Sequence, residues 1–421
     1  MRETHRRGRG APAALLVGVL VPCLLAGIAA AVPGMAPPPT PVPPRGSLSP
    51  FPSVLQTPAD ASARLPPSAA SVVLADLDTG QILSADGQTT SRAIASLTKV
   101  MTAIVVLDRA GPDDIVTVTS DAVFGPHDYG ASSTLGLRAG ERISVRDLLY
   151  GMLLGSANDA AIALADHVAG SVESFVRLMN ERARALGLRR STFVSPDGLD
   201  DRGRSTASDV LRLTRAAYRI PLFAHVVAAR KHDVRSSSHP VRHIQNRNAL
   251  LWLYPGAIGA KTGTTAAAGE CLVAVAQRNG TRLVAVVLGS PHEPFSEGAA
   301  LLNYGFEAFD RSKIVTRGQP EGTLAVRGGS VPVVAGADLT ALVAHPARVR
   351  IRTVTDRSVA FPPAPGERIG TLRVSSSGFD LGTVPLLAAV AALPPLPSGT
   401  WWSRAGESVA RAVVHAVGAL G

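Results

Sequence analysis

Residues 95–103 read ASLTKVMTA, a largely apolar stretch that carries one lysine, Lys99. The chain has 42 lysines and arginines, but only four of them are lysines, at positions 99, 231, 261 and 313. Arginine stays protonated near neutral pH, whereas a desolvated lysine can lose its proton. The rare lysines therefore indicate places where an ammonium that can titrate is needed, and Lys99 and Lys261 are the first candidates.

A serine lies three residues before Lys99. Positions i and i+3 of a helix share a face, so the Ser96 hydroxyl is expected beside the Lys99 ammonium. A serine hydroxyl needs a base to become a nucleophile, and a lysine in apolar surroundings near another cation has a lowered pKa. We predict that Ser96 is a nucleophile, Lys99 its base and Lys261 the second cation.

The segment Ser156-Ala-Asn158 follows an apolar helical pattern and is a candidate part of the same site. Ser156 would pass a proton between the lysines and a leaving group, and Asn158 would hold a substrate amide. The alternative is that Ser156 is a plain N-cap for a helix over 157–168.

The segment Lys261-Thr262-Gly263-Thr264 leads into a strand pattern. The small Gly263 would let an extended substrate approach the strand edge, and Lys261, Thr262 and Thr264 would meet a substrate carboxylate. The backbone N–H groups of Ser96 and Thr264 would form an oxyanion hole.

Composition limits the function. With 421 residues and 46% hydrophobic content, the chain is long enough for two or three domains with sizeable cores. The net charge of +10 is dispersed and aromatics are only 4%, so nucleic-acid binding is not expected. Cys23 lies in an apolar N-terminal segment that reads as a leader, and Cys271 is expected to be a core residue, so we predict no disulfide, metal or cofactor.

Changes in composition and hydrophobic pattern divide the chain into five parts. We predict a signal peptide or N-terminal anchor over 1–36, a proline-rich linker over 37–66, and a catalytic domain over 67–310. A small all-β domain is expected over 311–390, with strands at 349–353 and 371–374. Residues 398–421 form an amphipathic pattern that favours docking on a membrane surface, with packing on its own domain as the alternative.

Within residues 67–310, strand patterns at both ends enclose helical ones. A hairpin is expected around Asp78-Thr79-Gly80, and a second around Arg278-Asn279-Gly280. Helical patterns lie between them, at Ser96–Asp108, at LLYGMLL (148–154) after Ser144 and Asp147 as a capping pair, at 157–168 and at 172–186. A last helix, EGAALLNYGFEAF, would cover a sheet built from both ends of the segment.

These motifs, in this order, resemble the penicillin-interacting serine acyl enzymes, whose Ser-x-x-Lys and Lys-Thr-Gly signatures they match. The surrounding segments ASLTKVMTAIVVLD, GMLLGSANDAAIALA, TFVSPDGLD and NRNALLWLYPGAIGAKTGTT are similar to D-alanyl-D-alanine carboxypeptidases, the low-molecular-mass penicillin-binding proteins. The resemblance implies an α/β (α+β) domain of the penicillin-binding and serine β-lactamase type, with an antiparallel sheet and helices, followed by a small β-domain.

The resemblance also implies an activity and partners. Ser96 would attack the bond between the last two D-alanines of a peptidoglycan stem peptide, and β-lactams would acylate the same serine. The enzyme would act outside the cytoplasm, bound to the outer face of the cytoplasmic membrane or secreted to the cell wall. One departure from the pattern is that GSPHEPFSEG, after the last strand, lacks the arginine with which some members bind the terminal carboxylate.

Two other functions fit the motifs. A serine β-lactamase shares them, but a class A enzyme needs Glu-x-x-x-Asn between the second and third motifs, and neither Glu173 nor Glu181 is followed by asparagine at that distance. A catalytically silent wall-binding protein is the second alternative, although every motif side chain is intact.

Overall fold

The computed structural model describes residues 69–389, except 126–127, 129–132, 292, 327–328, 347, 357–358, 360–361 and 377–378. The predicted leader, linker and C-terminal amphipathic helix therefore lie outside the described residues. None of the helices in the described part has the length and apolarity that a bilayer span requires.

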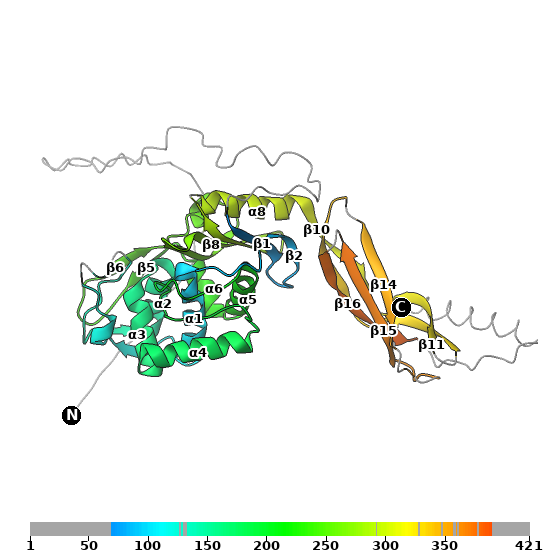
Figure 1. Ribbon diagram of the computed structural model, residues 1–421, viewed down its shortest axis with the longest axis horizontal. Helices are drawn as coiled ribbons and strands as arrows, with labels where there is room; N and C mark the ends of the chain where they lie inside the picture. The colour runs from blue at the N-terminus through cyan, green and yellow to red at the C-terminus, as the bar shows by residue number, and fades with distance from the viewer. Residues whose placement is uncertain are drawn as a thin grey trace, which may run out of the picture. The chain divides into compact units, whose positions relative to one another are not determined.

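A five-stranded antiparallel sheet with the order β2-β1-β9-β8-β7 forms the centre of the first part of the chain (Figure 1). Its strands are β1 (Ser71–Asp76), β2 (Ile82–Asp86), β7 (Ala257–Thr265), β8 (Gly269–Arg278) and β9 (Thr281–Ser290). The N-terminal strand β1 pairs with the C-terminal strand β9. This confirms the prediction of a sheet built from both ends of the segment.

The hairpin between β8 and β9 closes where the sequence places it. Arg278 pairs with Thr281, and the two residues between them have positive φ angles, 47° at Asn279 and 77° at Gly280. Two positive φ angles match the right-handed twist of a hairpin, and Asn-Gly adopts them at little cost.

Both faces of the sheet are buried. Along β1, Val73 and Ala75 belong to one core cluster, whereas Val72 and Leu74 belong to the other. Successive side chains of a strand point to opposite faces, so a strand covered on both sides must be apolar throughout. This explains the continuous apolar runs of β1, β8 and β9.

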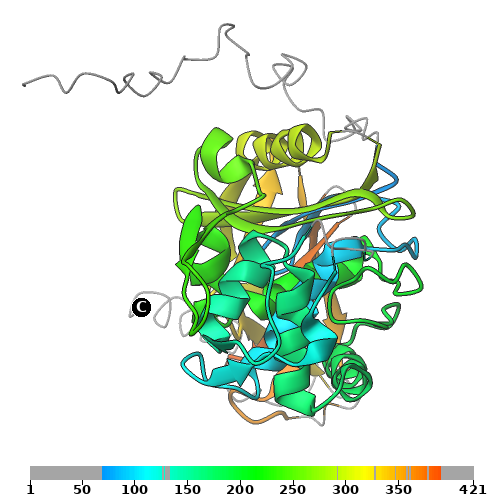
Figure 2. The same cartoon turned by 90° about the vertical axis from the view of Figure 1, so that its left-hand side faces the viewer.

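Helices cover the two faces unequally, as Figure 2 shows with the sheet between them. Helix α8 (Pro294–Ala308) covers one face, and the larger cluster lies on the other. The other helices are η2 (Ala95–Thr98), α1 (Lys99–Leu107), η3 (Ser120–Ala122), α2 (Val145–Leu154), α3 (Asn158–Ala169), α4 (Val172–Ala185), α5 (Ala207–Ala217), α6 (Pro221–Ala228) and α7 (Leu250–Leu253). The expected helices are confirmed in place, with bounds that differ by up to three residues; α8, for example, begins at Pro294, three residues before the expected helix. Ser144 accepts from the Asp147 N–H at 3.0 Å as predicted.

Short strands complete this part of the chain. Strand β3 (Ile115–Thr117) pairs with β4 (Arg142–Ser144), and β5 (Lys231–Val234) pairs with β6 (Arg242–Gln245). The β5–β6 hairpin leads directly into the segment before α7, which carries Arg247.

Residues 309–389, here called the C-terminal sheet region, contain only strands as regular elements in their described part. Strand β10 (Phe309–Val315) pairs with β13 (Leu339–Ala344), and five strands form a sheet with the order β11-β12-β16-β15-β14. These five are β11 (Pro320–Val326), β12 (Gly329–Ala335), β14 (Val349–Thr355), β15 (Arg368–Ser376) and β16 (Phe379–Ala388). The strands expected at 349–353 and 371–374 are confirmed as β14 and β15.

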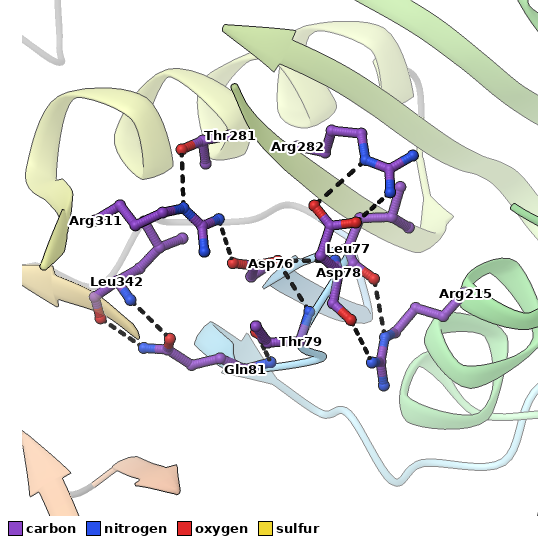
Figure 3. A network of polar contacts seen from close by, with 10 residues as sticks. All are labelled: Asp76, Leu77, Asp78, Thr79, Gln81, Arg215, Thr281, Arg282, Arg311 and Leu342. Atoms are coloured by element: carbon purple, nitrogen blue, oxygen red, sulfur yellow. Dashed lines mark hydrogen bonds and ion pairs between the residues drawn. The ribbon is translucent and has the colours of Figure 1, made fainter. Parts of the chain in front are cut away.

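The turn after β1 joins this region to the central sheet through a polar network (Figure 3). Asp76, whose side chain is fully buried, accepts the N–H groups of Asp78 and Thr79 at 2.8 and 3.1 Å and the Arg311 guanidinium at 2.7 Å. Gln81 pairs its amide with both backbone groups of Leu342, at 2.6 and 2.9 Å. One carboxylate thus organises the turn and binds the first strand of the C-terminal sheet region.

We expect Asp76→Ala to lower the free energy of unfolding by about 3 kcal/mol, because it leaves two turn N–H groups and the Arg311 charge without their acceptor. The matched control is Asp78→Ala, which breaks an ion pair between Asp78 and Arg282 that is more than a third exposed on both sides, and should cost under about 1 kcal/mol. Urea denaturation measures both variants. Equal losses would show that Asp76 has no special role.

Candidate active site

The serine and lysine of the first motif lie beside each other at the start of α1. Ser96 belongs to the 3₁₀ turn η2 and Lys99 is the first residue of α1, so the three-residue spacing places the two side chains on one face. Their Oγ and Nζ atoms are 2.9 Å apart. Ser96 is partly exposed, whereas Lys99 is fully buried. A substrate can therefore reach the hydroxyl but not the amine.

Two carbonyl oxygens fix the orientation of the Lys99 amine. Nζ donates to Oδ1 of Asn158 at 2.8 Å and to the backbone carbonyl of Asp197 at 2.6 Å. Neither oxygen carries a hydrogen, so each needs an N–H from the lysine. In the neutral amine these two bonds use both hydrogens, and the lone pair is left facing the Ser96 hydroxyl.

Burial lowers the pKa of Lys99 to about 8. The Asp197 carboxylate counteracts this by raising the pKa, the Arg247 charge lowers it further, and Asp159 raises it slightly. Desolvation disfavours the charged ammonium, as expected for a lysine among apolar side chains. A substantial fraction of Lys99 is therefore neutral at slightly alkaline pH, as a base must be.

The second and third motifs also place a serine hydroxyl beside a lysine amine. Lys261 Nζ donates to the Ser156 Oγ and to the Thr262 carbonyl, each at 2.9 Å. Burial, followed by the charges of Lys99 and Arg247, holds the pKa of Lys261 well below its usual value. The effect of Lys99 on Lys261 shows that the two ammonium groups share one electrostatic environment.

The N-cap alternative for Ser156 is wrong. Helix α3 has Ala157 at its N-cap position, and Ser156 precedes it with a φ of 63°. A non-glycine residue in the left-handed region is strained, and such residues concentrate at functional sites. Here the conformation belongs to a residue that is buried, at 4% exposure, and whose hydroxyl accepts from Lys261.

Strand β7 carries Lys261, Thr262, Gly263 and Thr264 at the edge of the sheet. A Cβ atom on Gly263 would lie 3.0 Å from the Ser96 nitrogen and 3.1 Å from the Leu97 nitrogen. The glycine therefore lets the strand itself pack against the turn that carries Ser96. The small size of Gly263 was predicted to serve substrate approach; in the structure its nearest neighbours are the backbone groups of this turn.

The eight predicted site residues thus lie on η2, at the start of α1, on the turn before α3, at the first residue of α3 and on β7. Thr262 is partly exposed and Thr264 is exposed, with its hydroxyl donating to Glu270 at 3.0 Å. The buried Cys271 has a pKa raised to about 11 by burial, consistent with its predicted place in the core.

A family model described as D-alanyl-D-alanine carboxypeptidase, peptidase S11, matches residues 59–292, more than half of the chain. The chain belongs to this family. The family resemblance seen in the sequence is confirmed, and membership makes the chain a serine peptidase. It also decides against the β-lactamase and the silent wall-binding protein that the motifs left open.

Known carboxypeptidases are similar in sequence to most of the chain. It is 35% identical over 336 residues to D-alanyl-D-alanine carboxypeptidase DacC of Escherichia coli, covering 75% of this chain and 82% of the relative. It is 41% identical over 267 residues to DacD of the same organism, covering 61% and 67%. Penicillin binding protein 5 from Haemophilus influenzae has a similar structure, with a TM-score of 0.65 and 30% identity, covering 77% of this chain and 97% of that one.

Two residues of the site were missed by sequence reasoning. Asp197 binds Lys99 through its backbone carbonyl, which no side-chain pattern reveals. Arg247 lowers the pKa of both lysines and donates to the Ser133 hydroxyl at 3.0 Å. It precedes the third motif, in NRNALLW, and so lies outside the segment after the last strand, where some family members carry a carboxylate-binding arginine.

Proposed function

We propose that the chain is a serine-type carboxypeptidase that removes the terminal D-alanine from peptidoglycan stem peptides through an acyl-enzyme on Ser96. The observation that carries this is the Ser96 hydroxyl held 2.9 Å from the buried amine of Lys99. In the first step the Ser96 oxygen attacks the carbonyl carbon of the penultimate D-alanine, and its proton passes to Lys99.

The leaving group needs a proton. As the C–N bond breaks, a proton passes through Ser156 to the amine of the terminal D-alanine, which departs. The Ser156 hydroxyl is suited to this because Lys261 holds it in place and because Asn158, two residues later, contacts Lys99. Water then attacks the ester carbonyl while Lys99 accepts its proton; as the bond between the acyl carbon and the Ser96 oxygen breaks, Lys99 returns that proton to the Ser96 oxygen and the shortened peptide is released.

The substrate is held along the outer edge of β7. The N–H groups of Ser96 and Thr264 stabilise the oxyanion, since Gly263 brings the strand against the nucleophile's turn. The terminal carboxylate lies near Thr262, Thr264 and the positive charges of Lys261 and Arg247. Arg247 thereby supplies, from before the third motif, the positive charge for this carboxylate that the segment after the last strand lacks.

The decisive experiment is incubation with diacetyl-L-Lys-D-Ala-D-Ala, with release of D-alanine measured before and after treatment with penicillin. We expect release that penicillin abolishes by acylating the enzyme. Diacetyl-L-Lys-D-Ala-L-Ala is the matched control and should be hydrolysed far more slowly. No release of D-alanine, or release unaffected by penicillin, would exclude the proposed activity.

The predicted leader and the amphipathic pattern over 398–421 support action outside the cytoplasm, on the outer face of the membrane. We infer that residues 398–421 dock on that surface and that 67–310 and 311–390 are separate domains. Sedimentation with membranes tests the docking, which deletion of 400–421 should abolish while D-alanine release persists.

The acylation rate should rise with pH through an apparent pKa of about 8. The base must be neutral, and below the Lys99 pKa it is protonated. Because Lys99 and Lys261 interact, the apparent value belongs to the pair. The pH dependence of kcat/KM measures it.

Asp197→Asn should move the midpoint of this pH profile to lower pH, because the Asp197 charge raises the Lys99 pKa. An unmoved midpoint would show that another group titrates.

A methyl group at Gly198 should disturb the nucleophile. Gly198 has a φ of +79°, and a Cβ there would lie 2.1 Å from the Ala95 carbonyl oxygen, next to Ser96. The matched control is Gly187, whose φ is +69° and whose Cβ would meet nothing within 4 Å. Both alanine variants bear the strain of positive φ, about 1 kcal/mol in stability.

Only Gly198→Ala forces the backbone beside Ser96 to move, and displacements of that kind lower activity by about 100-fold. We therefore expect D-alanine release to fall by that order in Gly198→Ala and to stay near wild type in Gly187→Ala. Similar activity in both variants would show that the close approach at Gly198 has no catalytic importance.

A further inference from the structure

Three arginines share one face at the edge of the C-terminal sheet region. Arg350 and Arg352 lie on the edge strand β14, and Arg373 lies on its neighbour β15; all three are exposed. Strands β14 and β15 are adjacent (Figure 1), and their register places Arg352 directly opposite Arg373. Arg350 is two residues from Arg352 and therefore points to the same face. We call these residues the arginine face.

No carboxylate of the described part lies within ion-pairing distance of the arginine face, whereas the nearby Arg368 pairs with Asp356 at 3.3 Å. The nearest acidic position in the register is Asp380, opposite Ser375 on β16, and its carboxylate accepts the Gly382 N–H. The three guanidinium groups thus form a local positive charge that the described protein does not neutralise.

This arrangement is unfavourable for the sheet alone. Like charges directly opposite each other on neighbouring strands destabilise the pair. Charged side chains on an edge strand prevent pairing with another chain, which accounts for Arg350 and Arg352. It does not account for Arg373, because β15 lies between β14 and β16 and is not an edge. A third arginine opposite the second is explained by an external anion.

The surroundings of the arginine face indicate the kind of anion. Its neighbours on the same face are the partly buried Thr371 and Ser375, with Val354 as the one exposed large apolar residue among the described residues of β14 and β15 on that face. The other exposed apolar residues nearby, Ile351 and Phe379, lie opposite Val374 and Ser376, on the other face. A surface that inserts into lipid needs apolar or aromatic side chains, which this face lacks.

We propose that the arginine face binds carboxylate groups of a peptidoglycan strand at a distance from the active site. This rests on the proposed function, which makes peptidoglycan the substrate. Guanidinium groups bind carboxylates with two parallel hydrogen bonds, and arginines about 7 Å apart along β14 suit carboxylates repeated along a polymer. The contact retains the enzyme on the wall while the catalytic site acts on individual stem peptides.

The test compares two charge-matched triple variants of the full chain. One is Arg350→Gln/Arg352→Gln/Arg373→Gln, and the control removes three other exposed arginines, Arg109, Arg184 and Arg189. Cosedimentation with purified insoluble peptidoglycan, at several salt concentrations, measures binding. We expect the first variant to bind about tenfold more weakly and with less salt dependence, and the control to bind like wild type.

Release of D-alanine from the soluble tripeptide separates this proposal from the proposed function. Both triple variants should retain wild-type release, and its absence from the wild-type protein would count against the function rather than the arginine face. Equal wall binding by the two variants overturns the proposal. Cosedimentation with phosphatidylglycerol vesicles is measured in parallel. If the first variant loses binding to the vesicles but not to peptidoglycan, the proposal is also overturned and the arginine face is assigned to lipid.

A single substitution keeps the test valid if the triple variant does not fold. Arg373→Gln removes the like-charge pair, so it should raise the melting temperature while weakening wall binding. A raised melting temperature with undiminished binding would contradict the proposal.

Discussion

Replacing Ser96 by alanine should abolish covalent labelling by a fluorescent penicillin and reduce D-alanine release on the order of 10⁴-fold or more. Alanine lacks the oxygen that forms the acyl bond, and the proposed site provides no second route. Ser96 is partly exposed and its neighbours Leu97 and Lys99 are fully buried, so removing one hydroxyl should leave the fold intact. Gel fluorescence and mass spectrometry measure the adduct.

Ser156→Ala is the matched control for this experiment. It removes a buried hydroxyl from the same site but leaves the nucleophile, so labelling should be slower and still reach completion. An adduct on Ser96→Ala, or its complete absence from Ser156→Ala, would mean that the nucleophile has been assigned to the wrong serine.

Replacing Lys99 by arginine should reduce acylation about 10³- to 10⁴-fold although the positive charge is kept. Arginine does not lose its proton near neutral pH, so it cannot accept the proton of Ser96. The planar guanidinium also cannot reproduce the single nitrogen that contacts Ser96, Asn158 and the Asp197 carbonyl. Stopped labelling reactions with penicillin give the acylation rate directly.

The control is the same substitution at Lys313, a lysine 48% exposed in the C-terminal sheet region. Lys313→Arg should label at the wild-type rate. Thermal melting of both variants establishes that they are folded. If folded Lys99→Arg turns over at the wild-type rate, the lysine provides charge and not a base, and the proposed mechanism is refuted.

Local patterns in the sequence predicted the two hairpins of the central sheet and the helices α1 to α4 and α8, because their physical cause is local; helices α5 to α7 and strands β3 to β6 were not predicted. The Asn279-Gly280 pair closes its hairpin through the φ angles that those two residues adopt readily, and Ser144 caps α2 three residues away. The three-residue spacing of Ser96 and Lys99 likewise brought hydroxyl and amine together within a single turn.

Contacts between distant segments could not be predicted in this way. Asp197 contributes a backbone carbonyl, a group that every residue has, so its role depends on where the loop lies and not on its side chain. Ser156 was assigned a helix cap as an alternative because its neighbours look like a helix start. What it bonds to is decided by Lys261, 105 residues later.

The sequence by itself therefore determined the family, through the order of its motifs, and predicted the chemistry: a serine nucleophile, a lysine able to lose its proton and a second lysine. The tertiary structure decided how that chemistry is tuned. Burial lowers the pKa of Lys99 to about 8, Arg247 lowers the pKa of both lysines, and Lys99 lowers the pKa of Lys261. Desolvation and charge proximity depend on distances in space, which only the packing of the sheet against its helices fixes.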